Sequence, residues 1–276
     1  MPLLTLTSDI GQYDFIVGAV KGRLLQSTNP CTIVDITHNL SPFNHPQAAY
    51  VCRNAIKSFP AGTIHLILVN LFDEKTDHLL LAEHNGQYIA CADNGLLTMI
   101  LEEVPQKVVA LAIDKTQQKN VLSCTAVFAK AFDAISQGKA IETIGDADVS
   151  IRVKNPLRAL LGTNWIDGQI IFIDNFENVI VNITKEEFEE QRKGRSFKIV
   201  FKRDEVIDRV SETYADVAEG EKLALFNSAG YLEIAINKGN AAGLFGLQGF
   251  SEKQQQAQKQ YQDSKLIYQS VRVYFE

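Results

Sequence analysis

Several predicted strands in this 276-residue sequence end in a small or acidic polar side chain, which is where a sheet can hold a polar ligand. The first strand, predicted at residues 3–7, ends in Ser8-Asp9 and is followed by Gly11 and a second acid, Asp14. In an open α/β sheet, ligands bind outside the carboxyl ends of the strands. Because a carboxylate has two acceptor oxygens, Asp9 is placed to hold two neighbouring hydroxyl groups of a ribose. The alternative is that Asp9 caps the helix predicted after it.

The same pattern recurs along the chain. Each of these polar residues alone is typical of a turn or a cap, but together they predict a polar pocket rim. Lys75 is the one cation close to them in the sequence, whereas a phosphate ligand calls for cationic or helix N-terminal partners. We therefore expect a small nucleoside ligand, and one with its own positive charge would suit the rim. The residues are Asn70, Asp93, Asn94, Asp174 and Asn178.

The composition is that of an ordinary globular protein, with 46% hydrophobic and 22% charged residues. A net charge of −6 argues against non-specific nucleic-acid binding. No apolar run reaches membrane-spanning length and the N-terminus lacks a signal-peptide pattern, so we expect a cytoplasmic protein with no membrane or nucleic-acid partner. The four cysteines lack C-x-x-C spacing, which indicates reduced core residues rather than disulfides or a zinc site.

Common cofactor and nucleophile motifs are missing from the sequence. No strand is followed by the dinucleotide-binding or phosphate-binding glycine motif, and there is no G-x-S-x-G elbow. The five histidines lack metal-ligand spacing, so we predict no metal. His38, three residues after Asp35, is expected to be a hydrogen-bond partner within its loop.

Alternating β and α patterns predict an α/β N-terminal domain over residues 1–155, with a mostly parallel sheet covered by helices. Asn85-Gly86 is a strong hairpin signal within it, and residues 96–103 and 123–137 have helical patterns. Short strands then dominate, which predicts a small antiparallel β-barrel or sandwich as the C-terminal domain over residues 164–276. Residues 184–187 (TKEE) fit a capping box for a short charged helix. Residues 251–265 are Gln-rich and polar, and we assign them no function.

Six motifs, in order and spacing, resemble those of the S-adenosylmethionine (SAM) hydroxide adenosyltransferases. These are SAM hydrolases, and the SAM-dependent fluorinase and chlorinase are their relatives. The motifs are TLTSDIG at 5–11 with VGAVKG at 17–22, IVDITH at 33–38, FPAGTIH at 59–65, ADNGLLT at 92–98, IDNFEN at 173–178 and NSAGYLEIA at 227–235. The resemblance implies an α/β N-terminal domain, a C-terminal β-barrel, and a homotrimer with SAM sites between neighbouring subunits.

The resemblance also implies a set of substrate-binding residues, with SAM as substrate and no cofactor. Asp9 would bind the ribose diol, Phe43 would face the ribose, and Asp14 would lie beside the methionine portion. Phe176 and Asn178 would surround the adenine, and Asp174 and Ser228 would hold the methionine amine and carboxylate. A carboxylate suits an ammonium, and an aromatic face suits a purine or a sulfonium. The complete set is Asp9, Asp14, Phe43, Asn94, Asp174, Phe176, Asn178 and Ser228.

The catalytic positions depart from the family pattern. Family hydrolases usually present an Asp, an Arg and a His that position water, where this chain has Asn70, Asp77 with His78 beside it, and Ser123. Because an amide cannot accept a proton and Asp77 reverses the Arg charge, we predict slow hydrolysis of SAM to adenosine and methionine by in-line attack of water on C5′. The alternative is a non-catalytic SAM- or adenosine-binding protein.

Halogenation is disfavoured by two further differences from the halogenase relatives. Ala229 stands where they carry an Arg that holds the methionine carboxylate. The chain also lacks their long insertion at the hairpin of Asn85-Gly86.

Overall fold

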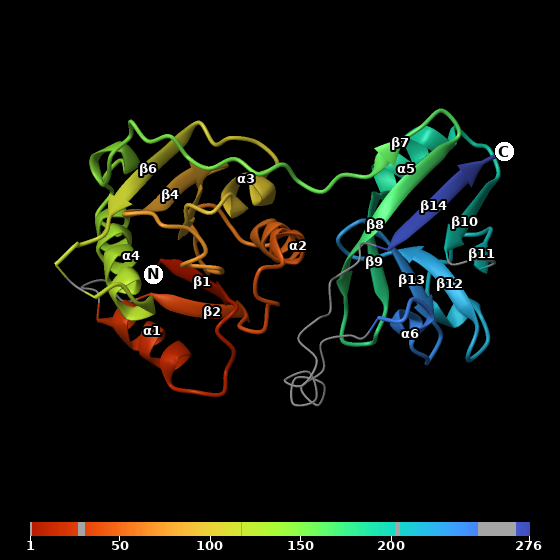
Figure 1. Cartoon of the computed structure of the whole chain (residues 1–276), viewed down its shortest axis with the longest axis horizontal. Helices are drawn as coiled ribbons and strands as arrows, with labels where there is room; N and C mark the ends of the chain where they lie inside the picture. The colour runs from red at the N-terminus through yellow and green to blue at the C-terminus, as the bar shows by residue number, and fades with distance from the viewer. Residues whose placement is uncertain (1, 27–30, 117, 202–204, 248–268) are drawn as a thin grey trace. The chain divides into compact units, whose positions relative to one another are not determined.

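The computed structural model describes residues 2–26, 31–116, 118–201, 205–247 and 269–276 (Figure 1). These form two compact units, Met1–Pro156 and Leu157–Glu276. No helix of the described residues is long and apolar enough to cross a membrane. The predicted Gln-rich segment, 251–265, lies outside the described residues.

A six-stranded, mostly parallel sheet forms the centre of the first unit, as predicted. The strand order is β2-β1-β3-β5-β4-β6, and pairing is parallel from β2 to β5. β4 is antiparallel to both of its neighbours, so β4 begins at the edge where β5 ends. The strands are β1 (Leu3–Ser8), β2 (Thr32–Thr37), β3 (Ile64–Leu68), β4 (His78–His84), β5 (Gln87–Ala92) and β6 (Lys107–Ala112).

Helices cover both faces of this sheet, which is why its central strands are almost continuously apolar. One face packs against α1 (Ile16–Leu25) and α4 (Val121–Ser136) through side chains such as Leu6 and Phe128. The other face packs against α2 (His45–Ile56) and α3 (Leu96–Leu101). A short 3₁₀ helix, η1 (Ile141–Thr143), follows α4.

Local signals set the boundaries of these elements. Asn85 and Gly86 have φ values of 50° and 73°, and a two-residue hairpin turn with both φ angles positive matches the twist of its strands. α4 begins two residues before its predicted start, because Asn120 caps it: Asn120 and Ser123 exchange side-chain to backbone hydrogen bonds in a capping box.

The second unit is an antiparallel, barrel-like sheet, as predicted, with strand order β11-β10-β14-β8-β9-β13-β12 and β7 paired to β8. An ion pair between Lys222 and Glu205 joins the two end strands, β12 and β11. The elements are β7 (Leu160–Leu161), β8 (Trp165–Ile173), β9 (Val179–Thr184), α5 (Lys185–Arg192), β10 (Phe197–Phe201), β11 (Glu205–Ile207), η2 (Tyr214–Asp216), β12 (Lys222–Phe226), β13 (Tyr231–Ile236), α6 (Ala241–Leu244) and β14 (Ser270–Phe275).

The core of the second unit is centred on Phe188 of α5. Its ring makes edge contacts with Phe197, Phe226 and Phe275, at centroid distances of 5.0, 5.4 and 5.6 Å. The predicted capping box holds α5 in place: the Thr184 hydroxyl accepts from the Glu187 backbone N–H, and the Glu187 carboxylate accepts in return from that of Thr184.

Candidate active site

The carboxyl edge of the first sheet brings together most of the predicted residues of this unit. Asp9 follows β1, Asn70 follows β3, and Asp93-Asn94 follow β5. His78 joins them because β4 is antiparallel, with Leu79 paired to Ala92 at the end of β5.

Asp9 is a half-buried acid held by a neighbouring strand end. Its Oδ2 accepts a hydrogen bond from the Asn70 backbone N–H at 2.9 Å, and desolvation by burial raises the pKa of the carboxyl group. It is not the cap of α1, because the residue before that helix is Phe15 and makes no side-chain cap bond. The acid near the helix start is instead Asp14, whose Oδ1 accepts from the Ile16 N–H at 2.9 Å.

Asn70 contacts Asp9 through its backbone and Phe43 through its side chain. Its backbone is left-handed, with φ of 48°, and its side-chain Oδ1 accepts from the Phe43 N–H at 2.8 Å. That contact fixes the amide orientation, because only the oxygen can accept. Among the described residues, the Nδ2 group then has no hydrogen-bond partner, although Asn70 is only 5% exposed. A buried donor of this kind is costly unless something pairs with it.

Phe43 presents an aromatic ring beside this cluster. Its side chain is 74% exposed, and its φ of 62° is unusual for a bulky residue. The hydrogen bond to Asn70 holds this backbone conformation. Strain of this kind gathers where a ligand requires a given orientation of the side chain.

His78 contacts a carboxylate on each side. Its Nε2 lies 3.2 Å from Asp93 Oδ2, and its Nδ1 lies 3.3 Å from Asp77 Oδ1. Asp77 also pairs with Lys115, whose hydrogen bond holds the pKa of the Asp77 carboxyl below its usual value. Asp77, His78 and Asp93 line an open cleft of about 670 Å³, together with Lys75, Thr76, Ser150, Ile151 and Arg152.

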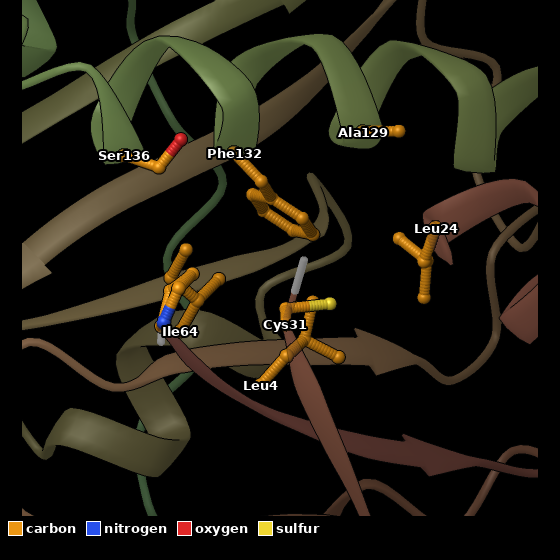
Figure 2. A pocket seen from close by; sticks show the side chains of 8 residues that line it. Leu4, Leu24, Cys31, Ile64, Ala129, Phe132 and Ser136 are labelled. Atoms are coloured by element: carbon orange, nitrogen blue, oxygen red, sulfur yellow. The ribbon is translucent and has the colours of Figure 1, made fainter. Parts of the chain in front are cut away.

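A second cavity, shown in Figure 2, lies at the opposite, amino edge of the sheet and is not suited to a nucleoside. It measures about 20 Å³, hardly more than one water molecule. Its lining is mostly apolar: Pro2, Leu4, Leu24, Cys31, Ile64, Ala129, Phe132 and Ser136.

Two predicted site residues of this unit have their side chains engaged internally. Asn94 is 1% exposed and donates from Nδ2 to the Val69 and Asn70 carbonyls, while its Oδ1 accepts from the Leu96 N–H. Ser123 belongs to the capping box of α4. His38 hydrogen-bonds through Nδ1 to the Ser8 hydroxyl at 2.8 Å; it is a hydrogen-bond partner, as expected, but its partner lies at the end of β1 and not in its own loop.

In the second unit, the predicted residues share the turn between β8 and β9. Asp174 Oδ1 accepts from the backbone N–H groups of Phe176 and Asn178, at 2.9 and 2.8 Å, and Oδ2 accepts from Asn178 Nδ2 at 3.0 Å. The Phe176 side chain is 75% exposed. Ser228 lies exposed in another turn, between β12 and β13, that Asn227 shapes by accepting from two backbone N–H groups.

Sequence reasoning missed a buried acid in this unit, Glu233. It is 3% exposed and accepts a hydrogen bond from the Tyr214 hydroxyl at 2.6 Å. Desolvation raises the pKa of the Glu233 carboxyl; the Tyr214 hydrogen bond opposes this, and the nearby Asp174 charge adds to it. A charged residue in the middle of the apolar run YLEIAI was the available signal.

The fold is that of a protein with two compact units. The carboxyl edge of a mostly parallel sheet presents Asp9 and the exposed ring of Phe43, and a barrel-like sheet presents Asp174 and the exposed ring of Phe176. The chain belongs to the SAM hydroxide adenosyltransferase family: its N-terminal domain model matches residues 4–145 and its C-terminal domain model matches residues 168–253.

Individual relatives are similar along most of their length. The (R)-S-adenosyl-L-methionine hydrolase of Methanocaldococcus jannaschii is 25% identical over 263 residues, covering 91% of this chain and 95% of the relative. The enzyme of that name from Thermus thermophilus is 27% identical, covering 87% and 94%. A fluorinase from Actinopolyspora mzabensis is 23% identical, covering 89% and 94%. The crystal structure of an uncharacterized conserved protein from Thermotoga maritima shares the fold, with a TM-score of 0.79, 23% identity and 99% of each chain covered.

Proposed function

We propose that this protein hydrolyses SAM to adenosine and methionine, by in-line attack of water on the ribose C5′. Relatives named as hydrolases of this compound support the reaction. The observation that carries the proposal is the half-buried Asp9 carboxylate, which pairs with no lysine or arginine within the described residues. A ligand that brings two hydroxyl donors and a nearby sulfonium charge supplies what this carboxylate lacks.

The reaction makes modest demands on the site. The leaving group is a neutral thioether, so no acid is needed for its departure. The site must align water, C5′ and sulfur and exclude bulk solvent. A base at the water is typically worth about 10²–10⁴-fold, so a site with Asn70 in place of the family acid is expected to be slow.

The remaining binding roles follow the family resemblance. Phe43 and Asp14 would contact the ribose and the methionine portion, and the turn that carries Asp174, Phe176 and Asn178 would receive the adenine and the amine. Ser228 would bind the methionine carboxylate. The internal hydrogen bonds of Asn94 and Ser123 support positioning roles for these two residues, because their side-chain groups are already engaged. We also propose a homotrimer with intersubunit sites, acting in the cytoplasm; analytical ultracentrifugation tests the trimer.

The test is incubation of pure protein with SAM, with chromatography for adenosine and methionine. Asp9→Asn keeps an acceptor for the Asn70 N–H but removes the charge. Asp208→Asn, an exposed acid in the second unit, is the matched control. We expect adenosine from the wild type and the control, and a large loss with Asp9→Asn. Full turnover by Asp9→Asn would show that Asp9 is not the ribose anchor.

A non-catalytic binder is the second candidate, and the amide of Asn70 favours it because an amide cannot take a proton from water. Calorimetric binding of SAM or adenosine without any product after long incubation would select this function. Failure to bind either compound would contradict both candidates.

A further inference from the structure

The contact between His78 and Asp93 has the geometry of a base held by an acid. Asp93 Oδ2 lies 3.2 Å from His78 Nε2, and Asp93 is 3% exposed. Its other oxygen, Oδ1, accepts from the Arg152 backbone N–H at 2.8 Å. The carboxylate is therefore anchored at one oxygen and turned toward the imidazole with the other. A carboxylate oxygen accepts hydrogen bonds, so we assign the ring proton of this contact to Nε2.

The second carboxylate at His78 is held differently. Asp77 lies 3.3 Å from Nδ1, but its side chain is 65% exposed and pairs with Lys115 at 3.1 Å. An exposed contact of this kind contributes little and exchanges readily with water. Of the two ring nitrogens, Nε2 is fixed and Nδ1 faces a group that can move away.

We propose that Asp93 is a positioning residue that fixes His78 in the Nε2–H tautomer, and that Nδ1 of His78 is the proton acceptor for the attacking water. This inference rests on the proposed hydrolysis. The amide of Asn70 cannot accept a proton, and the inference assigns this proton transfer to His78 instead.

The step balances without any further reactant. The water oxygen forms a bond to C5′ while the C5′–sulfur bond breaks, and its electron pair stays on sulfur as the neutral thioether of methionine. One water proton passes to Nδ1 of His78 and from there to solvent. The products are adenosine, methionine and a proton.

The charges around the ring favour this arrangement. Asp93 and Asp77 face the two nitrogens, and the cleft also contains Lys75 and Arg152. Arg152 pairs with Glu74 at 3.4 Å, and Lys115 pairs with Asp77. Arg152 is thus paired with Glu74, and Lys115 with Asp77, whereas Asp93 stabilises the imidazolium that forms when Nδ1 takes the proton.

Asp93→Asn is the discriminating variant. The Asn oxygen keeps the hydrogen bond from the Arg152 N–H, so its amide NH₂ group donates to Nε2, and the ring proton moves to Nδ1. We expect kcat for adenosine formation to fall about 10²–10⁴-fold, with little change in the KM for SAM. His78→Gln should show the same fall, and the double variant should fall no further. The acidic limb of the pH–rate profile should disappear in His78→Gln.

Nitrogen-15 NMR of the histidine rings at mildly alkaline pH tests the same inference without turnover. The His78 signals are those lost in His78→Gln. We expect the Nε2–H tautomer in the wild type and the Nδ1–H tautomer in Asp93→Asn. Thermal unfolding of each variant checks that the fold is retained.

The outcomes separate this inference from the proposed function. If the wild type is active and Asp93→Asn changes neither kcat nor the pH profile, Asp93 has only a structural role. That outcome would overturn this inference but not the proposed hydrolysis. An Nδ1–H or doubly protonated ring in the wild type would overturn it whether or not adenosine forms. An inactive wild type with the expected tautomers would refute the proton-transfer role and the hydrolysis together.

Discussion

Replacing Asn70 by Asp should speed up the proposed hydrolysis. The new carboxylate can keep the hydrogen bond from the Phe43 N–H through one oxygen. Its second oxygen would replace the buried Nδ2 group, which has no partner in the part of the chain that the structure describes. The change thus removes an unsatisfied donor and adds a proton acceptor at the end of β3. A positioned base is worth about 10²–10⁴-fold, so kcat for adenosine formation should rise by up to this factor in the His78→Gln background, and by less in the wild type, where His78 is proposed to take the proton.

The same substitution should lower the stability of the protein. The new acid lies next to Asp9, whose Oδ2 bonds to the same residue's backbone, and two nearby carboxylates hold on to one proton more strongly. The folded-state pKa of the pair is then raised above its unfolded value. Stability relative to the wild type is therefore lowest at neutral pH, by about 1–3 kcal/mol, and recovers as the pH falls. Urea unfolding across a pH series measures it.

The kinetic assay is chromatography of adenosine over a pH series, in the wild-type and His78→Gln backgrounds. The rate of N70D should climb with pH as the pair loses its last proton, and it should restore turnover to His78→Gln. Asn70→Ala, which has no acceptor, is the control. Each N70D protein is compared with the Asn70 protein of the same background. If N70D binds SAM normally and is no faster in either background, a carboxylate at position 70 does not accept the proton of the attacking water.

Three further changes test other parts of the structure. Asp9→Asn should raise the free energy of unfolding at neutral pH, because burial raises the pKa of this acid; the gain should vanish below the unfolded pKa, as a urea series in pH would show. Phe43→Gly should relieve the left-handed backbone, changing stability by no more than about 1 kcal/mol, yet weaken SAM binding at least tenfold by calorimetry; unchanged affinity would exclude the ring from the site. Gly168→Ala should destabilise the barrel-like unit by about 1–3 kcal/mol in urea, since a Cβ there would lie 2.6 Å from Ile183 Cγ1; a neutral result would mean that the strand shifts freely.

The features that could be predicted from the sequence are those that depend on residues close together in the chain. The hairpin at Asn85-Gly86 and the capping box at Thr184 depend on a few neighbouring residues, and both fold classes follow from hydrophobic period. The predicted start of α4 was two residues late because it was based on the helical pattern at 123–137 alone, which does not show that Asn120 caps the helix.

The long-range hydrogen bonds of the site could not be predicted from the sequence. The Asp9–Asn70 hydrogen bond joins residues 61 positions apart, and the His78–Asp93 contact exists only because β4 runs against its neighbours. No periodicity specifies the order of strands in a sheet. The Tyr214–Glu233 pair likewise depends on how η2 packs against β13.

The antiparallel direction of β4 gives the connection from Asn70 to Asp77 a particular status. It leaves the sheet and re-enters it at the same edge, so the whole connection stays beside the strand ends that hold Asp9 and Asp93. The tight turn between β4 and β5 fixes the register of both strands independently of it. A relative's residues could therefore be grafted into positions 71–77 without moving any strand of the sheet, so this connection can change independently of the strand ends beside it.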